Sequence, residues 1–427
     1  MADVIPEAAA TPAAPATSGA GLGNVPQVSR GALLFIFITI TIDLLSFGVI
    51  IPVLPHLIQE LVGGSISKAS MWSGIFSTVF ALTQFVCSPI QGALSDRYGR
   101  RLVILSSCLG LALDFALMAL ARSLPLLFIG RLISGATAAS FTTANAYIAD
   151  ITPPERRAAA FGKLGAAFGI GFVLGPALGS LLSTIDVRAP FWGSALLALC
   201  NFLYGLWVLP ESLPPERRSK HFRWSDANPL RALSNLRRYP QVVGLATVMT
   251  LFAVAHYVLP ATFVLYADYR YGWDQRTVGF VLAAAGICGA LVQAVLAGRA
   301  VARFGEPRTL LMGVFFGILG FAIYGLAPTG AAFCAGIPVL ALWGLASPAT
   351  QAMASRQVDP SEQGRLQGAL TGLSSLGGIF APFVFASLFA YAIEPGAPAH
   401  LPGAAFLLAS LLVLVAGAVA WSVVRRR

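Results

Sequence analysis

The sequence predicts an all-α membrane protein that crosses the bilayer twelve times in two groups of six helices. Three observations lead to this expectation. Hydrophobic residues make up 57% of the 427 residues and charged residues only 11%, whereas about a quarter of an ordinary soluble domain is charged. The chain also divides into uninterrupted apolar stretches, close to the about 20 residues that a hydrocarbon core requires of one helix. Finally, a loop pattern in the first half of the chain recurs in the second half.

Twelve apolar stretches are expected to form the membrane-spanning helices. Residues 1–29 are rich in Ala, Pro, Gly and Thr, and we expect them to form a disordered tail. Residues 210–240 are basic and polar and are expected to form a cytoplasmic linker, so that residues 30–209 and 241–427 make up the two six-helix halves. The expected helices lie near residues 31–55, 71–94, 102–121, 124–149, 158–184, 190–209, 241–266, 277–298, 308–327, 330–353, 365–392 and 402–424.

The distribution of Lys and Arg predicts the orientation of the chain. If the N-terminus is cytoplasmic, 22 of the 28 Lys and Arg fall on the cytoplasmic side, 5 on the opposite side, and Arg131 lies within a helix. Cytoplasmic loops are enriched in positive charge, so we expect a multi-pass cell-membrane protein with both termini in the cytoplasm. The net charge of +10 then follows from membrane topology, and we expect the lipid bilayer, not nucleic acid, as the partner of these residues.

An internal repeat indicates two related halves. The segment Gly92–Gly99 recurs 206 residues later as Gly298–Gly305, and both copies follow the second helix of their half. Parallel halves related about the membrane normal are typical of transporters, which bind substrate between the halves near the middle of the membrane. We do not expect an enzyme, because the sequence lacks the HExxH, GxSxG and GxxxxGK[ST] patterns. The five cysteines are expected to be packing residues, with no disulfide framework and no metal site.

The loop after the second predicted helix reads Gly92-Ala-Leu-Ser-Asp-Arg-Tyr-Gly-Arg-Arg101. It resembles the loop signature of the major facilitator superfamily, and the resemblance implies a cluster that latches the halves together on the cytoplasmic side in the outward-facing state. Asp96 can pair with Arg100 or lie near a helix N-terminus, and the glycines permit close approach of the backbone. Alternatively, these charges only flank helices and set topology. The expected cytoplasmic gate comprises Gly92, Asp96, Arg97, Gly99, Arg100, Arg101 and Asp150.

The fifth predicted helix carries regularly spaced glycines and one proline. Glycines three or four residues apart leave a groove for a neighbouring helix, and a proline disturbs the backbone hydrogen bonds of its own helix. The pattern resembles the fifth-helix motif of proton-driven drug antiporters within the same superfamily, although Ser180 replaces the usual second glycine. A generic packing groove is the alternative. The residues of this motif are Gly162, Gly171, Gly175, Pro176 and Gly179.

Ionisable residues within the predicted spans are few, and such residues are costly in a membrane and usually functional. Asp43, Asp114 and Arg131 are the clearest. A carboxylate in a low-dielectric cavity can take up and release a proton near neutral pH. The alternative is structural, in which the carboxylates pair with Arg131 or are capped by backbone groups and Arg131 is a buried structural cation. The segment that begins at Arg131 resembles a fourth-helix motif whose arginine is associated with proton coupling in this superfamily.

After residue 30, the order of features resembles the tetracycline-resistance efflux antiporters, for example in Ile42-Asp43, Leu113-Asp114 and the segment Tyr147–Thr152. The resemblance implies export of an amphipathic, tetracycline-like molecule by alternating access. It also implies essential membrane aspartates at Asp43 and Asp114, no cofactor beyond the proton gradient, and a possible metal-chelated substrate. Two positions depart from the family, because Gly289 stands where the eighth helix carries a histidine and Gly317 where the ninth carries an aspartate.

Other polar residues within the predicted spans could line the substrate cavity. A lone histidine such as His256 is otherwise a hydrogen-bonded packing residue. We expect a functional monomer that exports its substrate in exchange for protons. Proton-coupled uptake of a small metabolite on the same fold is the alternative, and a membrane sensor without transport is a third possibility. The candidate cavity residues besides the charged ones are Gln84, Asn145, His256, Gln293 and Gln351.

Overall fold

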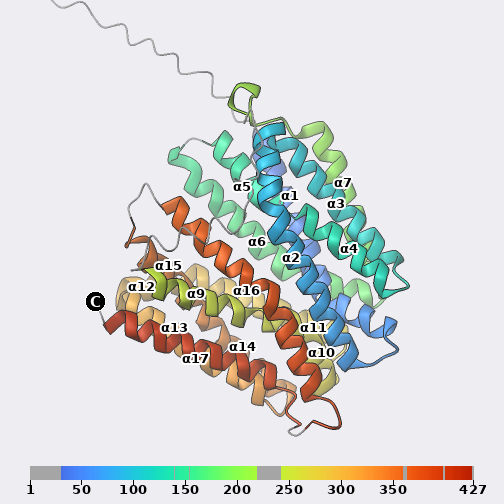
Figure 1. Cartoon of the computed structure of the whole chain (residues 1–427), viewed down its shortest axis with the longest axis vertical. Helices are drawn as coiled ribbons and strands as arrows, with labels where there is room; N and C mark the ends of the chain where they lie inside the picture. Colours follow the sequence, from blue (N-terminus) through green and yellow to red (C-terminus); the bar gives the residue numbers. More distant parts are fainter. Residues whose placement is uncertain are drawn as a thin grey trace, which may run out of the picture.

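The computed structural model describes residues 30–138, 140–152, 154–218, 242–358, 363–397 and 400–425 (Figure 1). These residues form helices and short connections. The predicted tail, 1–29, and most of the predicted linker lie outside the described residues. The helices are α1 (Arg30–Leu61), α2 (Ile66–Tyr98), α3 (Arg100–Leu120), α4 (Leu124–Thr137), α5 (Ser140–Ile151), α6 (Pro154–Ser183), α7 (Ala189–Val208), η1 (Pro215–Arg217), α9 (Val243–His256), α10 (Val258–Tyr271), α11 (Gln275–Leu291), η4 (Val292–Ala297), α12 (Gly298–Phe304), α13 (Glu306–Leu326), α14 (Gly330–Ala341), η5 (Leu342–Leu345), α15 (Ala346–Ser355), α16 (Gln363–Ala392) and α17 (Ala404–Arg425).

The lengths and hydropathy of these helices fit membrane spans. Within the described part of the chain, ten helical stretches are long and apolar enough to cross a bilayer. Two shorter apolar stretches, Leu124–Thr137 and Gly169–Ser183, coincide with the predicted fourth and fifth spans. The all-α membrane fold is therefore confirmed, and the number of twelve crossings is consistent with it.

Two of the predicted spans are interrupted next to prolines. The seventh divides into α9 and α10 at Tyr257, and Pro260 has no N–H to donate to the carbonyl of His256. In the tenth, α14 passes through the 3₁₀ segment η5 into α15, and Pro348 cannot donate to the carbonyl of Gly344. The Gly344 carbonyl instead accepts a hydrogen bond from the Gln293 side chain at 3.4 Å.

The fourth and eighth predicted spans are interrupted without a proline. The fourth divides after Thr137, whose hydroxyl donates to the Ile133 carbonyl at 2.9 Å. Beside this break, the Gln91 side chain donates to the carbonyl of Ala136. The eighth contains the π-helical segment η4 between α11 and α12. Such π segments are rare and often lie at functional sites, and Gln293 lies in this one.

The helices form two groups, which we call the N-terminal half (α1–α7) and the C-terminal half (α9–α17). In the N-terminal half α1 packs on α6 and α3 on α7, and in the C-terminal half α13 and α9 pack on α17. The halves meet along two reciprocal helix pairs, α2 with α16 and α6 with α11 (Figure 1). In each pair the second helix of one half packs on the fifth helix of the other, so the halves are related by a pseudo-twofold axis.

The hydrogen bonds between the halves lie at one end of the bundle. The hydroxyls of Ser70 and Thr78 in α2 donate to the α16 carbonyls of Ala386 and Ile379, each at 2.8 Å. On the other pair of helices, Gly279 of α11 lies directly against Ser180 and Pro176 of α6. We call this end, which carries the loops at residues 62–65, 184–188 and 272–274, the closed end. The opposite end carries the turns at Gly99 and Gly305 and residues 209–218, and we call it the linker end.

Candidate functional site

A buried ion pair lies inside the N-terminal half. Asp114 of α3 is 0% exposed and Arg131 of α4 is 6% exposed, and the Arg131 Nη2 donates to the Asp114 Oδ2. The same nitrogen lies 3.3 Å from the Met118 sulfur, and the guanidinium lies over the Phe80 ring, 5.8 Å from its centroid. The two charges are therefore held by each other in an otherwise apolar environment, where breaking the pair is costly.

The pairing leaves one oxygen of Asp114 without a partner. Asp114 Oδ1 and Arg131 Nε are buried and have no hydrogen-bond partner among the described residues. Gly130 makes room for this oxygen, because a Cβ there would come within 2.8 Å of it. A buried oxygen without a partner is energetically costly, and it is an available acceptor for a proton or for a hydrogen-bond donor.

Asp43 lies apart from this pair in a second polar region. It is half-buried in α1, within electrostatic range of the Cys108 thiol in α3. The Thr39 hydroxyl donates to the Asn201 amide oxygen at 3.2 Å, and the Asn201 nitrogen donates to the Cys108 sulfur at 3.5 Å. The described contacts of Arg131 therefore join it to Asp114 and not to Asp43. Asn201 of α7 was not predicted, because one amide in an apolar span carries no motif.

A polar and aromatic cluster lies in the C-terminal half. His256 is exposed although protein atoms surround it closely, so its ring borders a space inside the bundle. Its ring centroid lies 6.0 Å from that of Trp343, which also contacts Phe252 at 5.6 Å. Trp343 Nε1 is buried and has no hydrogen-bond partner among the described residues. We call His256, Trp343 and Gln293 the histidine–tryptophan cluster, since Gln293 bonds to Gly344, the neighbour of Trp343.

The two family departures have different surroundings. A Cβ on Gly317 would come within 2.6 Å of Trp343 Cδ1, so the indole ring occupies the space that a side chain at this position would need. No atom lies within 4 Å of where a Cβ on Gly289 would be, so a larger side chain would fit there. Trp343 thus accounts for the glycine at position 317, and nothing in the packing explains the one at 289.

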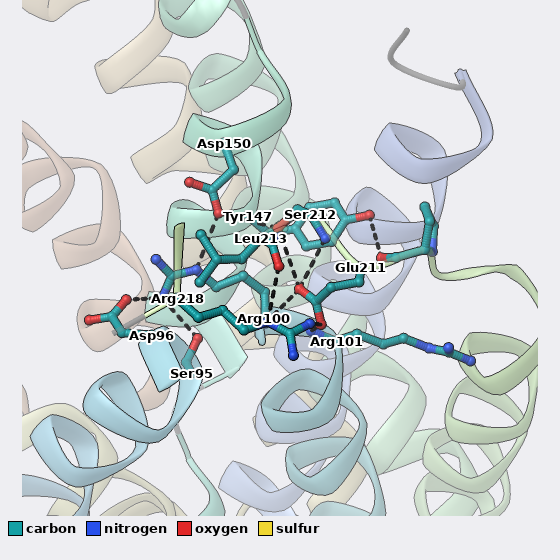
Figure 2. Close-up of polar contacts among 11 residues, drawn as sticks. Ser95, Asp96, Arg100, Arg101, Tyr147, Asp150, Glu211, Ser212, Leu213 and Arg218 are labelled. Atoms are coloured by element: carbon teal, nitrogen blue, oxygen red, sulfur yellow. Dashed lines mark hydrogen bonds and ion pairs between the residues drawn. The ribbon is translucent and has the colours of Figure 1, made fainter. Parts of the chain in front are cut away.

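At the linker end, Arg100 binds acidic and polar groups of its own half (Figure 2). Its guanidinium lies 2.5 Å from Asp96 and 3.2 Å from Asp150, and it donates to the Ser95 hydroxyl at 2.9 Å. The expected pairing of Arg100 with Asp96, and the approach of Asp150 to the arginines, are both present. The latch between the two halves is not formed in this conformation by the Arg100 contacts, since all three partners belong to the N-terminal half.

Glu211 completes this network and was not predicted. Its carboxylate accepts hydrogen bonds from the backbone N–H groups of Arg100 at 2.8 Å and Arg101 at 3.3 Å, at the N-terminus of α3 (Figure 2). An anion at a helix N-terminus is favourable because unpaired N–H groups and the helix dipole meet there. Gly99 has φ +106°, and a Cβ on it would collide with the Glu211 carboxylate. The start of the linker is thereby attached to the α2–α3 turn.

We expect Glu211→Gln to destabilise the N-terminal half. The amide oxygen can still accept a hydrogen bond, but the negative charge at the α3 N-terminus is lost, at a cost of about 1 kcal/mol for a partly exposed group. Thermal unfolding of the purified protein in detergent measures the effect. Glu216→Gln, in the exposed helix η1, is the matched control, and an equal loss in both variants would contradict the role assigned to Glu211.

The glycines of the fifth-helix motif form the expected groove, and the helix within it is α1. A Cβ on Gly171, Gly175 or Gly179 would meet α1 backbone or side-chain atoms at 2.6–2.8 Å. Gly48 of α1 lies against Gly175 and Pro176 in turn. Gly162 lies in α6, but its surroundings are outside the described residues.

The other predicted residues lie in separate places. Arg101 donates to the Leu206 carbonyl at 2.6 Å, and Arg97 lies over the neighbouring Tyr98 ring at 5.1 Å. The close backbone approach expected at Gly92 is absent, because no atom lies within 4 Å of its Cβ position and α2 borders open space there. The remaining cavity candidates are half-buried in three different helices: Gln84 in α2, Asn145 in α5 and Gln351 in α15.

The fold and these polar groups define a class of protein. Two pseudo-symmetric helical halves, with charges buried inside one of them and polar groups bordering an internal space in the other, are the features of a membrane transporter. The chain belongs to the Major Facilitator Superfamily, whose family profile matches residues 36–382 and 270–427. It is accordingly a multi-pass membrane protein.

Relatives and solved structures agree with this assignment. The chain is 40% identical to the class C tetracycline resistance protein of Escherichia coli, over 92% of this chain and 98% of the relative. It is 37% identical to the class G protein of Vibrio anguillarum, over 84% and 91%. Among solved structures, the nucleoside transporter NupG has a TM-score of 0.75 at 14% identity, covering 92% of this chain and 99% of the other. A bacterial homologue of the human lysosomal transporter Spinster has a TM-score of 0.73 at 17% identity, covering 92% and 96%.

Proposed function

We propose that this protein is a proton-coupled efflux antiporter that exports an amphipathic, tetracycline-like small molecule. Similarity to the tetracycline resistance proteins of classes C and G over most of the chain supports the substrate class. The observation that carries the mechanism is the buried Asp114–Arg131 pair with its unpartnered carboxylate oxygen. The proposed setting is the bacterial inner membrane, with both termini in the cytoplasm and a monomer as the working unit.

The proposed coupling step is the protonation of Asp114. The ionised carboxylate neutralises Arg131, and the two charges together are compatible with an apolar interior. A proton arriving at Asp114 cancels its charge, so the Arg131 guanidinium loses its partner and must find another. Transport follows if the proton and the substrate favour different positions of Arg131 and hence different positions of the halves, because a ligand shifts an equilibrium only by its differential affinity for the two states.

The histidine–tryptophan cluster is the proposed contact surface for the substrate. Small-molecule sites combine apolar and aromatic surface with a few polar groups, and here the Trp343 ring adjoins His256 and Gln293. The open space at Gly289 lies on α11, the helix that continues into η4 and Gln293. Within the described residues, no three His, Cys, Asp or Glu side chains gather into a metal site. A divalent metal is therefore proposed only as part of a chelated substrate.

The described conformation is proposed to be inward-facing. The hydroxyls of α2 join the halves at the closed end, whereas at the linker end Arg100 binds only within its own half. The excess of Lys and Arg places the linker end in the cytoplasm. Rocking of the halves would open the closed end and bring the linker ends together.

Inverted membrane vesicles test the proposal. With tetracycline as the first compound, an imposed proton gradient that is acidic inside should drive drug accumulation, and drug addition should release protons from the vesicles. Substrate movement out of the vesicles with protons would instead support uptake by proton symport, which the relatives do not favour. An absence of coupled flux across a panel of amphipathic drugs would contradict both.

A further inference from the structure

The two halves carry the same inter-helix bridge with opposite charges. A shift of 206 residues relates Gly99 to Gly305, and both glycines have positive φ, +106° and +77°. The same shift relates Arg100 to Glu306 and Asp150 to Arg356. Arg100 Nε lies 3.2 Å from Asp150, and Arg356 Nη2 lies 2.8 Å from Glu306. Each bridge joins the start of the third helix of its half to the end of the fourth.

The exposure of the bridge residues follows the same order in both halves. The residue on the third helix is the more buried one, with side-chain exposure of 13% for Arg100 and 9% for Glu306. The residue at the end of the fourth helix is the more exposed one, at 26% for Asp150 and 75% for Arg356. Each half therefore anchors one charge and presents the other, and the presented charges are opposite.

Pseudo-twofold symmetry makes this inversion significant. The reciprocal contacts of α2 with α16 and α6 with α11 relate each residue to its counterpart 206 positions away. In an interface of this kind, equivalent positions near the axis face one another. Identical residues there would set like charges against each other. Asp150 and Arg356, at the linker-end termini of α5 and α15, instead present complementary charges, and Figure 1 shows these helices on the same side of the molecule.

We infer that Asp150 and Arg356 meet across the pseudo-twofold axis when the linker end closes and form an ion pair that stabilises the outward-facing state. Arg100 and Glu306 are positioning residues, since each holds one member of the pair within its own half in the inward-facing state. The inference rests on the proposed alternating access. It identifies two gating residues in the C-terminal half, Glu306 and Arg356, that the repeated loop sequence does not reveal because the charges are reversed.

Chemical crosslinking tests the contact without requiring a substrate. In a variant whose five native cysteines are replaced by serine, the pair Asp150→Cys/Arg356→Cys is treated in membranes with a short, reducible bifunctional thiol reagent. The matched control is Ser70→Cys/Ala386→Cys, two positions in contact at the closed end. We expect both pairs to crosslink, and each crosslink to stop transport until it is reduced, because each traps one state.

The outcomes separate this inference from the proposed function. If Ser70→Cys/Ala386→Cys crosslinks and Asp150→Cys/Arg356→Cys does not, in a protein that transports, the ion pair is refuted and antiport stands. If the second pair crosslinks equally well after the first has been locked, closure of the two ends is independent and the inference is also refuted. If both crosslinks form alternately in a protein without proton-coupled flux, the inference stands and the coupling proposal is wrong.

A charge exchange within one half separates gating from local structure. Glu306→Arg/Arg356→Glu keeps a bridge in the C-terminal half but places two acids, Asp150 and the new glutamate, opposite one another. We expect the alkylation rate of Ser70→Cys, which is buried in this conformation, to fall several-fold because the outward-facing state is less populated. An unchanged rate would show that only the local bridge matters. Arg276→Glu, at the closed end, is the control for a change of net charge.

Discussion

Asp114→Asn is expected to abolish proton-coupled transport while the protein still inserts into the membrane. The substitution keeps the size of the side chain but removes the only group in the Asp114–Arg131 pair that can exchange a proton near neutral pH. Arg131 keeps its charge at every accessible pH, since the guanidinium pKa lies far above the physiological range. Drug accumulation in inverted vesicles and its stimulation by the proton gradient measure the effect.

Stability has to be measured beside transport in this variant. A buried ion pair that loses one partner is destabilised by about 3–5 kcal/mol, because here Arg131 would be left with the Met118 sulfur and the Phe80 ring. The double variant Asp114→Asn/Arg131→Gln removes both charges and should recover much of the stability without recovering coupled transport. Normal proton-driven flux in Asp114→Asn would remove this carboxylate from the mechanism.

The fold could be predicted from the sequence because the bilayer imposes a simple rule. A spanning segment must be long, apolar and internally hydrogen-bonded, so hydropathy alone places the helices. The interruptions could not be predicted in the same way. The break in the tenth span depends on Pro348, but it is stabilised by Gln293 of another helix, which bonds the freed Gly344 carbonyl. Such a contact exists only once the helices are packed.

The candidate site was predictable where a residue is costly in a membrane. Asp114 and Arg131 stand out in apolar runs, and the structure pairs them. Whether that pair is structural or carries protons was open from the sequence and stays a proposal. Glu211 and Trp343 were missed for different physical reasons. An acid next to a basic linker has no pattern of its own, and a tryptophan in an apolar stretch is indistinguishable from ordinary core until its neighbours are known.

The packing of α1 on α6 gives the second large expected effect. A Cβ on Gly175 would come within 2.6 Å of the Leu45 carbonyl oxygen and 2.7 Å of Gly48 Cα. Both contacts are with backbone atoms, which cannot rotate away as a side-chain tip can, so the two helices would have to separate. We expect Gly175→Ala to cost about 1–3 kcal/mol, as overpacking does in well-packed cores.

Gly169→Ala is the matched control on the same helix, because no atom lies within 4 Å of where its Cβ would be. Alanine there should be neutral or stabilising, since it favours the helix by up to about 1 kcal/mol over glycine. Thermal unfolding in detergent compares the two variants. Transport should fall as well in Gly175→Ala, because displacement of α1 moves Asp43, which lies on that helix. Equal stability of the two variants would mean that α1 and α6 can separate at little cost, and the groove would then not constrain the position of α1.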